Sequence, residues 1–173
     1  VSASMLKSIG VNWALAGHSE RRVLFNESDE YINGQCRKLM ELGMSVILCI
    51  GESEAEYEQN LAGAVCAIQL KKGLAGIPKE DMNRVAIAYE PVWAIGTGKV
   101  ATPETAQNVH ATCRAILAEM YDQETADSVR ILYGGSVSPD SVDSLMAKPD
   151  IDGTLVGGAS LDSKKFARII NFQ

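Results

Sequence analysis

The fold of this chain is best predicted from the stretch VAIAYEPVWAIGTGK, which occupies residues 85–99. Its first five residues are apolar, as in a strand that other elements cover on both faces. Glu90 follows at the carboxyl end of this strand, and Pro91 ends the strand by removing a backbone donor. In parallel α/β architectures active sites are built at this end of the strands. Glu90 is therefore a candidate catalytic base, whereas the stretch taken alone also fits a glutamate in a surface turn.

The residues after Glu90 are predicted to form a lid. They begin as a rigid, apolar segment, and glycines follow at positions 96 and 98. This order suits a loop that moves as one piece over a carboxylate.

Length and composition bound the class of protein. The chain has 173 residues, of which 46% are hydrophobic, enough for one substantial core. No linker or low-complexity segment divides it, so a single domain over residues 1–173 is predicted. No apolar run approaches the roughly 20 residues that span a bilayer. The net charge of −6 without a basic stripe gives nucleic-acid binding little support, and cytoplasm is the expected location.

The cysteines show no close metal-ligand or redox spacing. Buried, reduced thiols in a cytosolic protein are the expectation, and no metal site is predicted. The four residues are Cys36, Cys49, Cys66 and Cys113.

Strand-like and helical patterns alternate along the chain. Strands are predicted at Trp13–Ala16, Ser45–Ile50, Val85–Tyr89, Val129–Tyr133 and Gly153–Val156. Helices are predicted at about Ser28–Leu42, Glu54–Lys72, Pro103–Tyr121, Pro139–Ala147 and Ser163–Ile170, after a helical remnant at Ser4–Ser8. This alternation indicates βαβ units and a parallel sheet. Five such units fit part of a (β/α)₈ barrel or an open doubly wound sheet, and periodicity does not separate the two.

One histidine follows a predicted strand directly. His18 is followed by Ser19 and Glu20, which resemble the opening of a helical turn. The positive end of a helix dipole disfavours the imidazolium form, and a neutral imidazole can donate a hydrogen bond to a developing oxyanion. A satisfied structural histidine is the alternative. His110 lies within a helical pattern, and no role is assigned to it.

Two glycine pairs leave the last two predicted strands just before helices. They are Gly134-Gly135, followed by Ser136, and Gly157-Gly158. Glycine lets backbone N–H groups approach an anion closely, although tight turns also require glycine. Two such pairs in the final units match the phosphate site of barrel enzymes.

Together these features suit proton abstraction beside a carbonyl in a small phosphorylated substrate. Another phosphate-binding barrel enzyme, such as a sugar-phosphate isomerase or a lyase, is one alternative. A non-catalytic phosphate-binding or scaffold remnant of a barrel is another.

Five segments of the chain resemble motifs of the triosephosphate isomerase family, in the family's order and over residues 1–173. They are Ala16–Arg22, Cys49–Glu52, Ala88–Gly98, Tyr133–Val137 and Leu155–Ser160. The resemblance implies an α/β fold, a partial TIM (β/α)₈ barrel of about five C-terminal βα units. It also implies cofactor-free interconversion of dihydroxyacetone phosphate and D-glyceraldehyde 3-phosphate, in glycolysis and gluconeogenesis.

The resemblance also implies roles for single residues. Glu90 would move the proton, His18 would polarise the carbonyl, and Glu20 would support the site. Gly96, Ser136, Gly157 and Gly158 would bind the phosphate. The lid would consist of Pro91, Val92, Trp93, Ala94, Ile95, Gly96, Thr97, Gly98, Lys99, Val100 and Ala101. Contacts from Trp93 to Glu52, from Tyr133 to Ala101 and from Ser136 to Gly98 would hold it.

Family members begin with three further βα units, which bring an asparagine, a catalytic lysine and the loop that interlocks their homodimers. No residue of this sequence matches that lysine, and Lys99 lies on the lid side. We therefore expect little or no isomerase activity from these 173 residues alone.

Overall fold

The computed structural model describes residues 1–95, 97 and 99–173 of the chain. Five strands form one sheet in the order β1-β2-β3-β4-β5, and every neighbouring pair is parallel. A doubly wound sheet reverses its strand order at a switch point, whereas a barrel sheet keeps the order of the sequence. The observed order therefore resolves the alternatives in favour of a partial TIM barrel. The strands are β1 (Trp13–Ala16), β2 (Ser45–Ile50), β3 (Val85–Tyr89), β4 (Arg130–Tyr133) and β5 (Gly153–Thr154).

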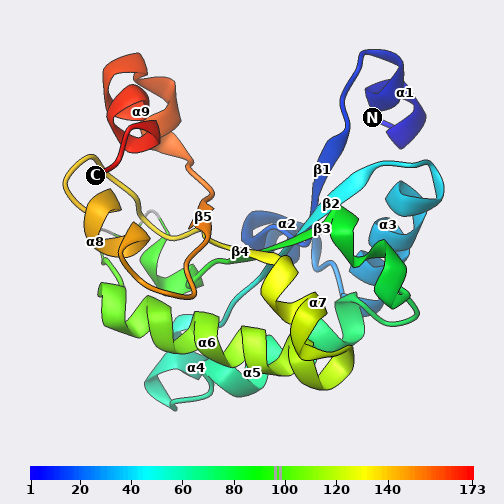
Figure 1. Ribbon diagram of the computed structural model, residues 1–173, viewed down its shortest axis with the longest axis horizontal. Coiled ribbons are helices and arrows are strands. Elements are labelled where there is room, and N and C mark those ends of the chain that lie inside the picture. The colour runs from blue at the N-terminus through cyan, green and yellow to red at the C-terminus, as the bar shows by residue number, and fades with distance from the viewer. Residues whose placement is uncertain (96, 98) are drawn as a thin grey trace.

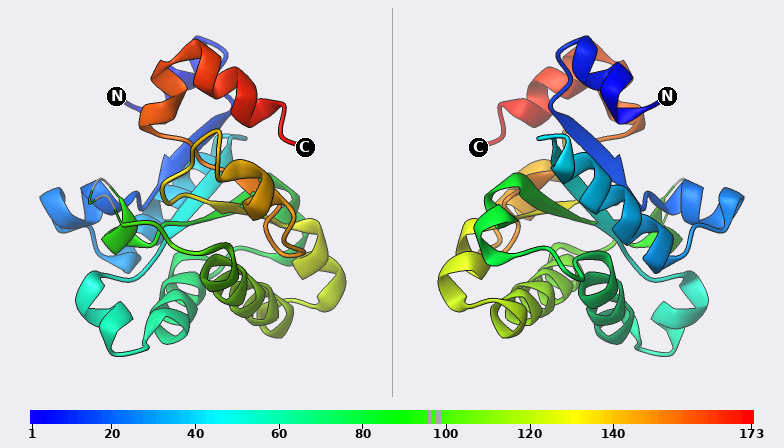
Figure 2. Two further views of the ribbon diagram at one scale, coloured as in Figure 1. Left: turned by 90° about the vertical axis from the view of Figure 1, so that its left-hand side faces the viewer. Right: turned by 90° about the vertical axis from the view of Figure 1, so that its right-hand side faces the viewer.

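Helices connect successive strands and cover the outer side of this sheet. Figure 1 shows α5 and α6 side by side below the strands, with α3 beyond β1 and β2. The two terminal helices, α1 and α9, lie at the opposite side of the sheet from α5 and α6 in both views of Figure 2. The α-helices are α1 (Ala3–Ser8), α2 (Ser19–Phe25), α3 (Asp29–Glu41), α4 (Glu54–Glu58), α5 (Ala62–Gly73), α6 (Pro103–Met120), α7 (Gln123–Ser128), α8 (Val142–Met146) and α9 (Ser163–Ile170). Three 3₁₀ helices are η1 (Lys79–Arg84), η2 (Val92–Ala94) and η3 (Gly158–Leu161).

The predicted helix at Glu54–Lys72 was wrong in one respect, because the structure divides it into α4 and α5. Asn60 lies between them with φ of 58°, a left-handed conformation that ends a helix. The predicted strand at Gly153–Val156 is also shorter, since only two of its residues pair with β4. Helix α7 was not predicted.

Capping residues explain where the helices that flank the lid begin. Ser53 and the side chain of Glu56 form a reciprocal capping box at the start of α4. Thr102 accepts from the Thr105 amide, and Pro103 occupies the first turn of α6. The side chains of Ser53 and Thr102 thus cap these two helices.

The core is centred on β3, whose five residues are all buried. This strand pairs Tyr89 with Ile50 of β2 on one side and with Tyr133 of β4 on the other. The residue that follows each strand therefore lies at the same edge of the sheet, so the register alone brings Glu90 beside Gly134. All four cysteines are free and buried, as predicted.

No helix within the described ranges is both long and apolar enough to cross a membrane.

Candidate active site

The predicted base and the predicted electrophile are in direct contact. Glu90 Oε1 lies 3.2 Å from His18 Nε2, and the Glu90 side chain is only 3% exposed. Glu90 Oε2 accepts a 2.9 Å hydrogen bond from the backbone N–H of Ser19. Both oxygens of the carboxylate are thus held by the segment that follows β1.

Burial determines the proton affinity of this carboxylate. Loss of solvent raises the pKa of Glu90 above its ordinary value, and the Ser19 N–H and His18 oppose this effect. A carboxylate with a raised pKa is a stronger base than an exposed one. The environment of Glu90 therefore suits proton abstraction.

His18 is held as a neutral donor. It is the N-cap residue of α2, and its Nδ1 accepts from the Glu20 backbone N–H at 3.3 Å. A nitrogen that accepts carries no proton, so the ring proton lies on Nε2, the atom that contacts Glu90. This geometry agrees with the predicted neutral imidazole.

The loop that carries His18 depends on one glycine. Gly17 has φ of 79°, and a Cβ there would lie 3.0 Å from the Cys49 carbonyl oxygen. The Arg22 guanidinium donates to the carbonyls of both Gly17 and Cys49. These contacts fix the loop after β1 against the end of β2.

The supporting role expected of Glu20 is carried by its backbone N–H and not by its side chain. Its side chain is exposed and makes no hydrogen bond within the described ranges, although it lines the cavity beside Glu90. The backbone N–H of Glu20 instead orients His18.

A cavity of about 560 Å³ opens beside Glu90 and His18, at the carboxyl ends of the strands. The predicted phosphate ligands Ser136, Gly157 and Gly158 line its far side, and the structure brings them together with the two catalytic candidates. Gly96, the fourth predicted phosphate ligand, lies outside the described residues.

The two glycine pairs serve different purposes. A Cβ on Gly135 would lie 2.2 Å from the Tyr133 hydroxyl, whereas a Cβ on Gly157 or Gly158 would meet nothing within 4 Å. Packing within the fold therefore requires glycine at position 135. The open space over Gly157 and Gly158 leaves their backbone accessible to a ligand.

The first half of the predicted lid is anchored by Glu52. Trp93 Nε1 and the Tyr89 hydroxyl both donate to Glu52 Oε1, at 2.7 and 3.0 Å. The Trp93 ring also stacks on Tyr57 with centroids 4.1 Å apart. The expected contact between Trp93 and Glu52 is thus present, and the sequence reasoning missed the contribution of Tyr89.

Of the two remaining lid contacts that were expected, only the one from Tyr133 to Ala101 can be compared with the structure. The Tyr133 hydroxyl is buried and lies near the Ala101 backbone, but it forms no well-aligned hydrogen bond with a described residue. Burial raises the pKa of Tyr133 to about 12, and the nearby Ala101 backbone opposes this effect. The expected contact between Ser136 and Gly98 lies outside the described residues.

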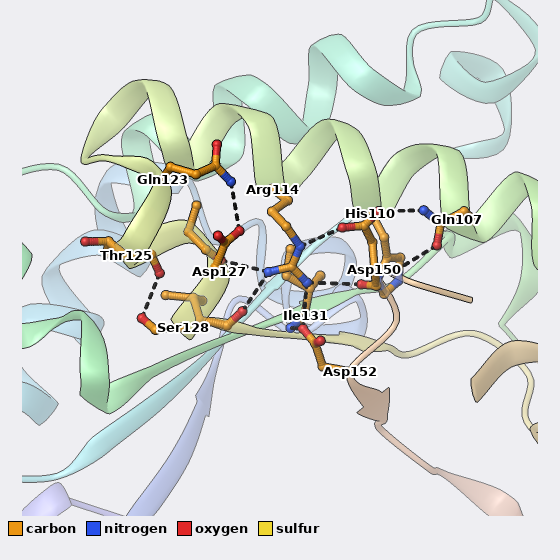
Figure 3. Close-up of polar contacts among 12 residues, drawn as sticks. Gln107, His110, Arg114, Gln123, Thr125, Asp127, Ser128, Ile131, Asp150 and Asp152 are labelled. Atoms are coloured by element: carbon orange, nitrogen blue, oxygen red, sulfur yellow. Dashed lines mark hydrogen bonds and ion pairs between the residues drawn. The ribbon is translucent and has the colours of Figure 1, made fainter. Parts of the chain in front are cut away.

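Behind the site, side chains of α6 bind the loop that leads into β5 (Figure 3). Arg114 donates to the carboxylates of Asp150 and Asp152, and Asp152 accepts from the Ile131 backbone N–H at the start of β4. His110 Nδ1 lies 3.0 Å from the Asp150 carbonyl oxygen. This cluster fixes the position of β5 and so of the glycines that follow it.

Sequence reasoning missed two groups in this region. Ser19 acts on Glu90 through its backbone N–H, which no side-chain motif reveals. His110 had no role assigned, although it is fully buried.

The sheet order and the cavity together define a class: barrel enzymes that transfer a proton at the carboxyl ends of their strands. Comparison with known proteins narrows this class. The family model described as triosephosphate isomerase matches residues 1–173. The chain therefore belongs to the triosephosphate isomerase family.

Individual relatives agree with this assignment. A triosephosphate isomerase of Chloroflexus aurantiacus is 50% identical over 173 residues, which are 100% of this chain and 69% of the relative. One of Herpetosiphon aurantiacus is 51% identical over 173 residues, also 100% of this chain and 69% of the relative. One of Solibacter usitatus is 50% identical over 172 residues, which are 99% of this chain and 69% of the relative.

Proposed function

We propose that this chain carries the proton-transfer site of a triosephosphate isomerase, which interconverts dihydroxyacetone phosphate and D-glyceraldehyde 3-phosphate. The observation that carries the proposal is the contact between Glu90 and neutral His18 at the wall of a glycine-lined cavity. No cofactor takes part in this reaction.

The first chemical step is assigned to Glu90. Its carboxylate removes a proton from the carbon beside the carbonyl, and the resulting enediolate receives a proton back on the former carbonyl carbon. The hydroxyl proton passes from one oxygen of the enediolate to the other, so the carbonyl and hydroxyl groups exchange places. To reach the substrate, Glu90 leaves the Ser19 N–H that now holds Oε2. Pro91 and the lid follow Glu90 directly in the chain, so a movement of the lid moves the base with it.

His18 is assigned to the carbonyl oxygen. Its Nε2–H now points to Glu90, and the same donor can turn to the oxygen of a substrate that separates the two side chains. Because His18 is neutral, its Nε2–H can stabilise negative charge on that oxygen without a prior loss of a proton to solvent. Glu20 supports this role by holding the opposite ring nitrogen.

The substrate phosphate is assigned to Ser136, Gly157 and Gly158, and to Gly96 from the lid. Binding energy from this distant group can drive lid closure and so favour the transition state. Water exclusion by the closed lid also limits loss of phosphate from the enediolate.

Three further assignments belong to this proposal. The isomerase is expected to work as a homodimer in the cytoplasm, with residues 1–173 as a single domain. Exposed apolar side chains on α2, at Val23, Leu24 and Phe25, provide one surface that an assembly can bury. The mass of the isomerase from analytical ultracentrifugation tests whether it is a dimer.

A non-catalytic scaffold is the other function considered for this chain, and the buried base beside a neutral donor does not favour it. The test is isomerase turnover on glyceraldehyde 3-phosphate, measured with and without the Glu90→Gln substitution, on the chain mixed with the part of the Chloroflexus aurantiacus relative that it does not match. A scaffold binds phosphate equally well with either residue and shows no turnover that depends on Glu90.

A further inference from the structure

The second histidine of the chain is a buried polar group that the proton transfer does not use. His110 belongs to α6 and is fully buried. Its Nδ1 lies 3.0 Å from the Asp150 carbonyl oxygen, which can only accept, so Nδ1 carries the ring proton. Burial lowers the pKa of His110 to about 4, and the ring is therefore neutral near pH 7. Its Nε2 is consequently an unprotonated acceptor.

The His110 ring lies among the tyrosines that support the lid. It meets Tyr89 edge-on with centroids 5.7 Å apart, and its centroid is 6.4 Å from that of Tyr133. Tyr89 donates its hydroxyl to Glu52, the residue that also anchors Trp93. The histidine thus packs against Tyr89, which lies just before the start of the lid. It also packs against Tyr133, which lies near Ala101 at the end of the lid.

Two polar atoms of this aromatic cluster have no hydrogen-bond partner among the described residues. They are His110 Nε2 and the Tyr133 hydroxyl, and both are buried. An unpaired buried polar group costs about 1–3 kcal/mol, so such atoms are normally satisfied. The imidazole nitrogen can only accept and the hydroxyl can donate, so the two atoms are chemically complementary.

We propose that His110 is a positioning residue of the isomerase site, whose Nε2 accepts the hydroxyl proton of Tyr133 through one ordered water. With that proton directed inward, the Tyr133 oxygen presents only lone pairs toward the backbone N–H of Ala101, at the end of the lid. Without this acceptor the hydroxyl can turn its proton toward the lid and oppose the contact. This inference rests on the proposed function, in which the lid closes over the substrate.

The first test is ¹⁵N NMR of the two histidine rings, with the substitution His110→Gln identifying the His110 signals. We expect His110 to carry its proton on Nδ1 and His18 to carry it on Nε2. Tyr133→Phe should shift the His110 Nε2 resonance toward that of an unbonded nitrogen. Tyr89→Phe is the matched control, because it removes a hydroxyl from the same cluster but one that donates to Glu52.

Two results of this NMR test would overturn the proposal: a proton on His110 Nε2, or an Nε2 resonance unchanged by Tyr133→Phe. Neither result depends on turnover, so an inactive protein would contradict the proposed function and leave this test valid. Because Tyr133→Phe keeps the histidine, the test also survives a His110 variant that fails to fold.

The second test asks whether the acceptor acts on the lid. In a Trp13→Phe background, Trp93 fluorescence is followed as inorganic phosphate is added. His110→Asn keeps a donor for Asp150 but loses the acceptor, whereas His110→Gln keeps a polar group near the position of Nε2. We expect half-maximal phosphate to rise about fivefold with asparagine, the loss typical of one hydrogen bond, and to change little with glutamine. Equal responses of the two variants would show a purely structural histidine.

Discussion

His18 Nε2 lies 3.2 Å from Glu90 Oε1, and two consecutive backbone amides hold this pair. The Ser19 N–H binds Glu90 Oε2, and the Glu20 N–H binds His18 Nδ1. The first turn of α2 therefore orients both the proposed base and the proposed electrophile. It also fixes which nitrogen of His18 carries the proton, because an accepting Nδ1 leaves only Nε2 to donate.

The position of the donor on His18 leads to a prediction about two substitutions. His18→Gln can place an amide N–H near the position of Nε2, whereas His18→Asn places it near Nδ1. We expect the asparagine variant to lose about 10²–10³-fold in kcat, as when one oxyanion donor is removed, and the glutamine variant to lose clearly less. Steady-state kinetics on glyceraldehyde 3-phosphate measures this difference, on the chain mixed with the part of the Chloroflexus aurantiacus relative that it does not match. Near-normal kcat for both variants would show that another donor polarises the carbonyl.

The raised pKa of Glu90 predicts a gain in stability when its charge is removed. A folded-state pKa above the unfolded value means that the folded state binds the proton more tightly, so stability falls as the pH rises through the folded pKa. Glu90→Gln removes this cost while keeping an acceptor for the Ser19 N–H. We expect a higher Tm than that of the parent at pH 8 and a smaller difference at pH 4.

Thermal denaturation at both pH values tests this prediction. Glu54→Gln is a control, because Glu54 is half exposed and its charge pairs with Lys99 at the surface. A Glu90→Gln variant less stable than the parent at pH 8 would contradict the argument from burial.

The glycines that follow the last two strands predict different effects of substitution by alanine. Gly135→Ala would place Cβ 2.2 Å from the Tyr133 hydroxyl and should lower Tm, because overpacking costs about 1–3 kcal/mol. Gly157→Ala meets nothing within 4 Å and should leave Tm nearly unchanged. If the phosphate occupies the space over Gly157, the second variant should bind phosphate more weakly. Normal phosphate affinity in a folded Gly157→Ala variant would remove Gly157 from the binding site.

Burial of His110 predicts a loss of stability in mild acid. Its folded-state pKa of about 4 is below the unfolded value of 6.5, so the unfolded state binds more protons between these pH values. Stability should therefore decrease as the pH falls from 6.5 to 4, by at most about 3 kcal/mol from this residue. Burial outweighs Asp150 and Asp152, which favour protonation of the ring, and Arg114 acts in the same direction as burial.

Urea unfolding at several pH values measures this slope, and His110→Gln should flatten it between pH 6.5 and 4. An unchanged slope would mean that the pH dependence arises from other groups.

The sequence predicted the sheet well because β3 and β2 are continuous apolar runs between clear turn signals. It failed at Asn60, where a left-handed residue divides a helix that composition alone would continue. It also could not separate a barrel segment from a doubly wound sheet, because strand order is a property of the whole sheet.

The parts of the candidate site that side chains form could be predicted from the sequence. Glu90, His18 and the second glycine pair were proposed from their residue types and positions at strand ends, and the structure brings them to one cavity. The sequence did not predict the Ser19 amide or the buried environment of His110, since a backbone N–H has no sequence signal. A histidine within a helical pattern also gives the same signal whether it faces solvent or the core.

The most direct test of the central claim is isomerase turnover on glyceraldehyde 3-phosphate, with Glu90→Gln measured in parallel. The chain spans 69% of the Chloroflexus aurantiacus relative. The assay is therefore run on the chain alone and on its mixture with the part of that relative that it does not match. We predict activity on mixing that falls about 10³-fold with Glu90→Gln, the contribution typical of a general base. Equal turnover of the parent chain and the Glu90→Gln variant, or no turnover from a folded mixture, would contradict the assignment of Glu90 as the base of an isomerase.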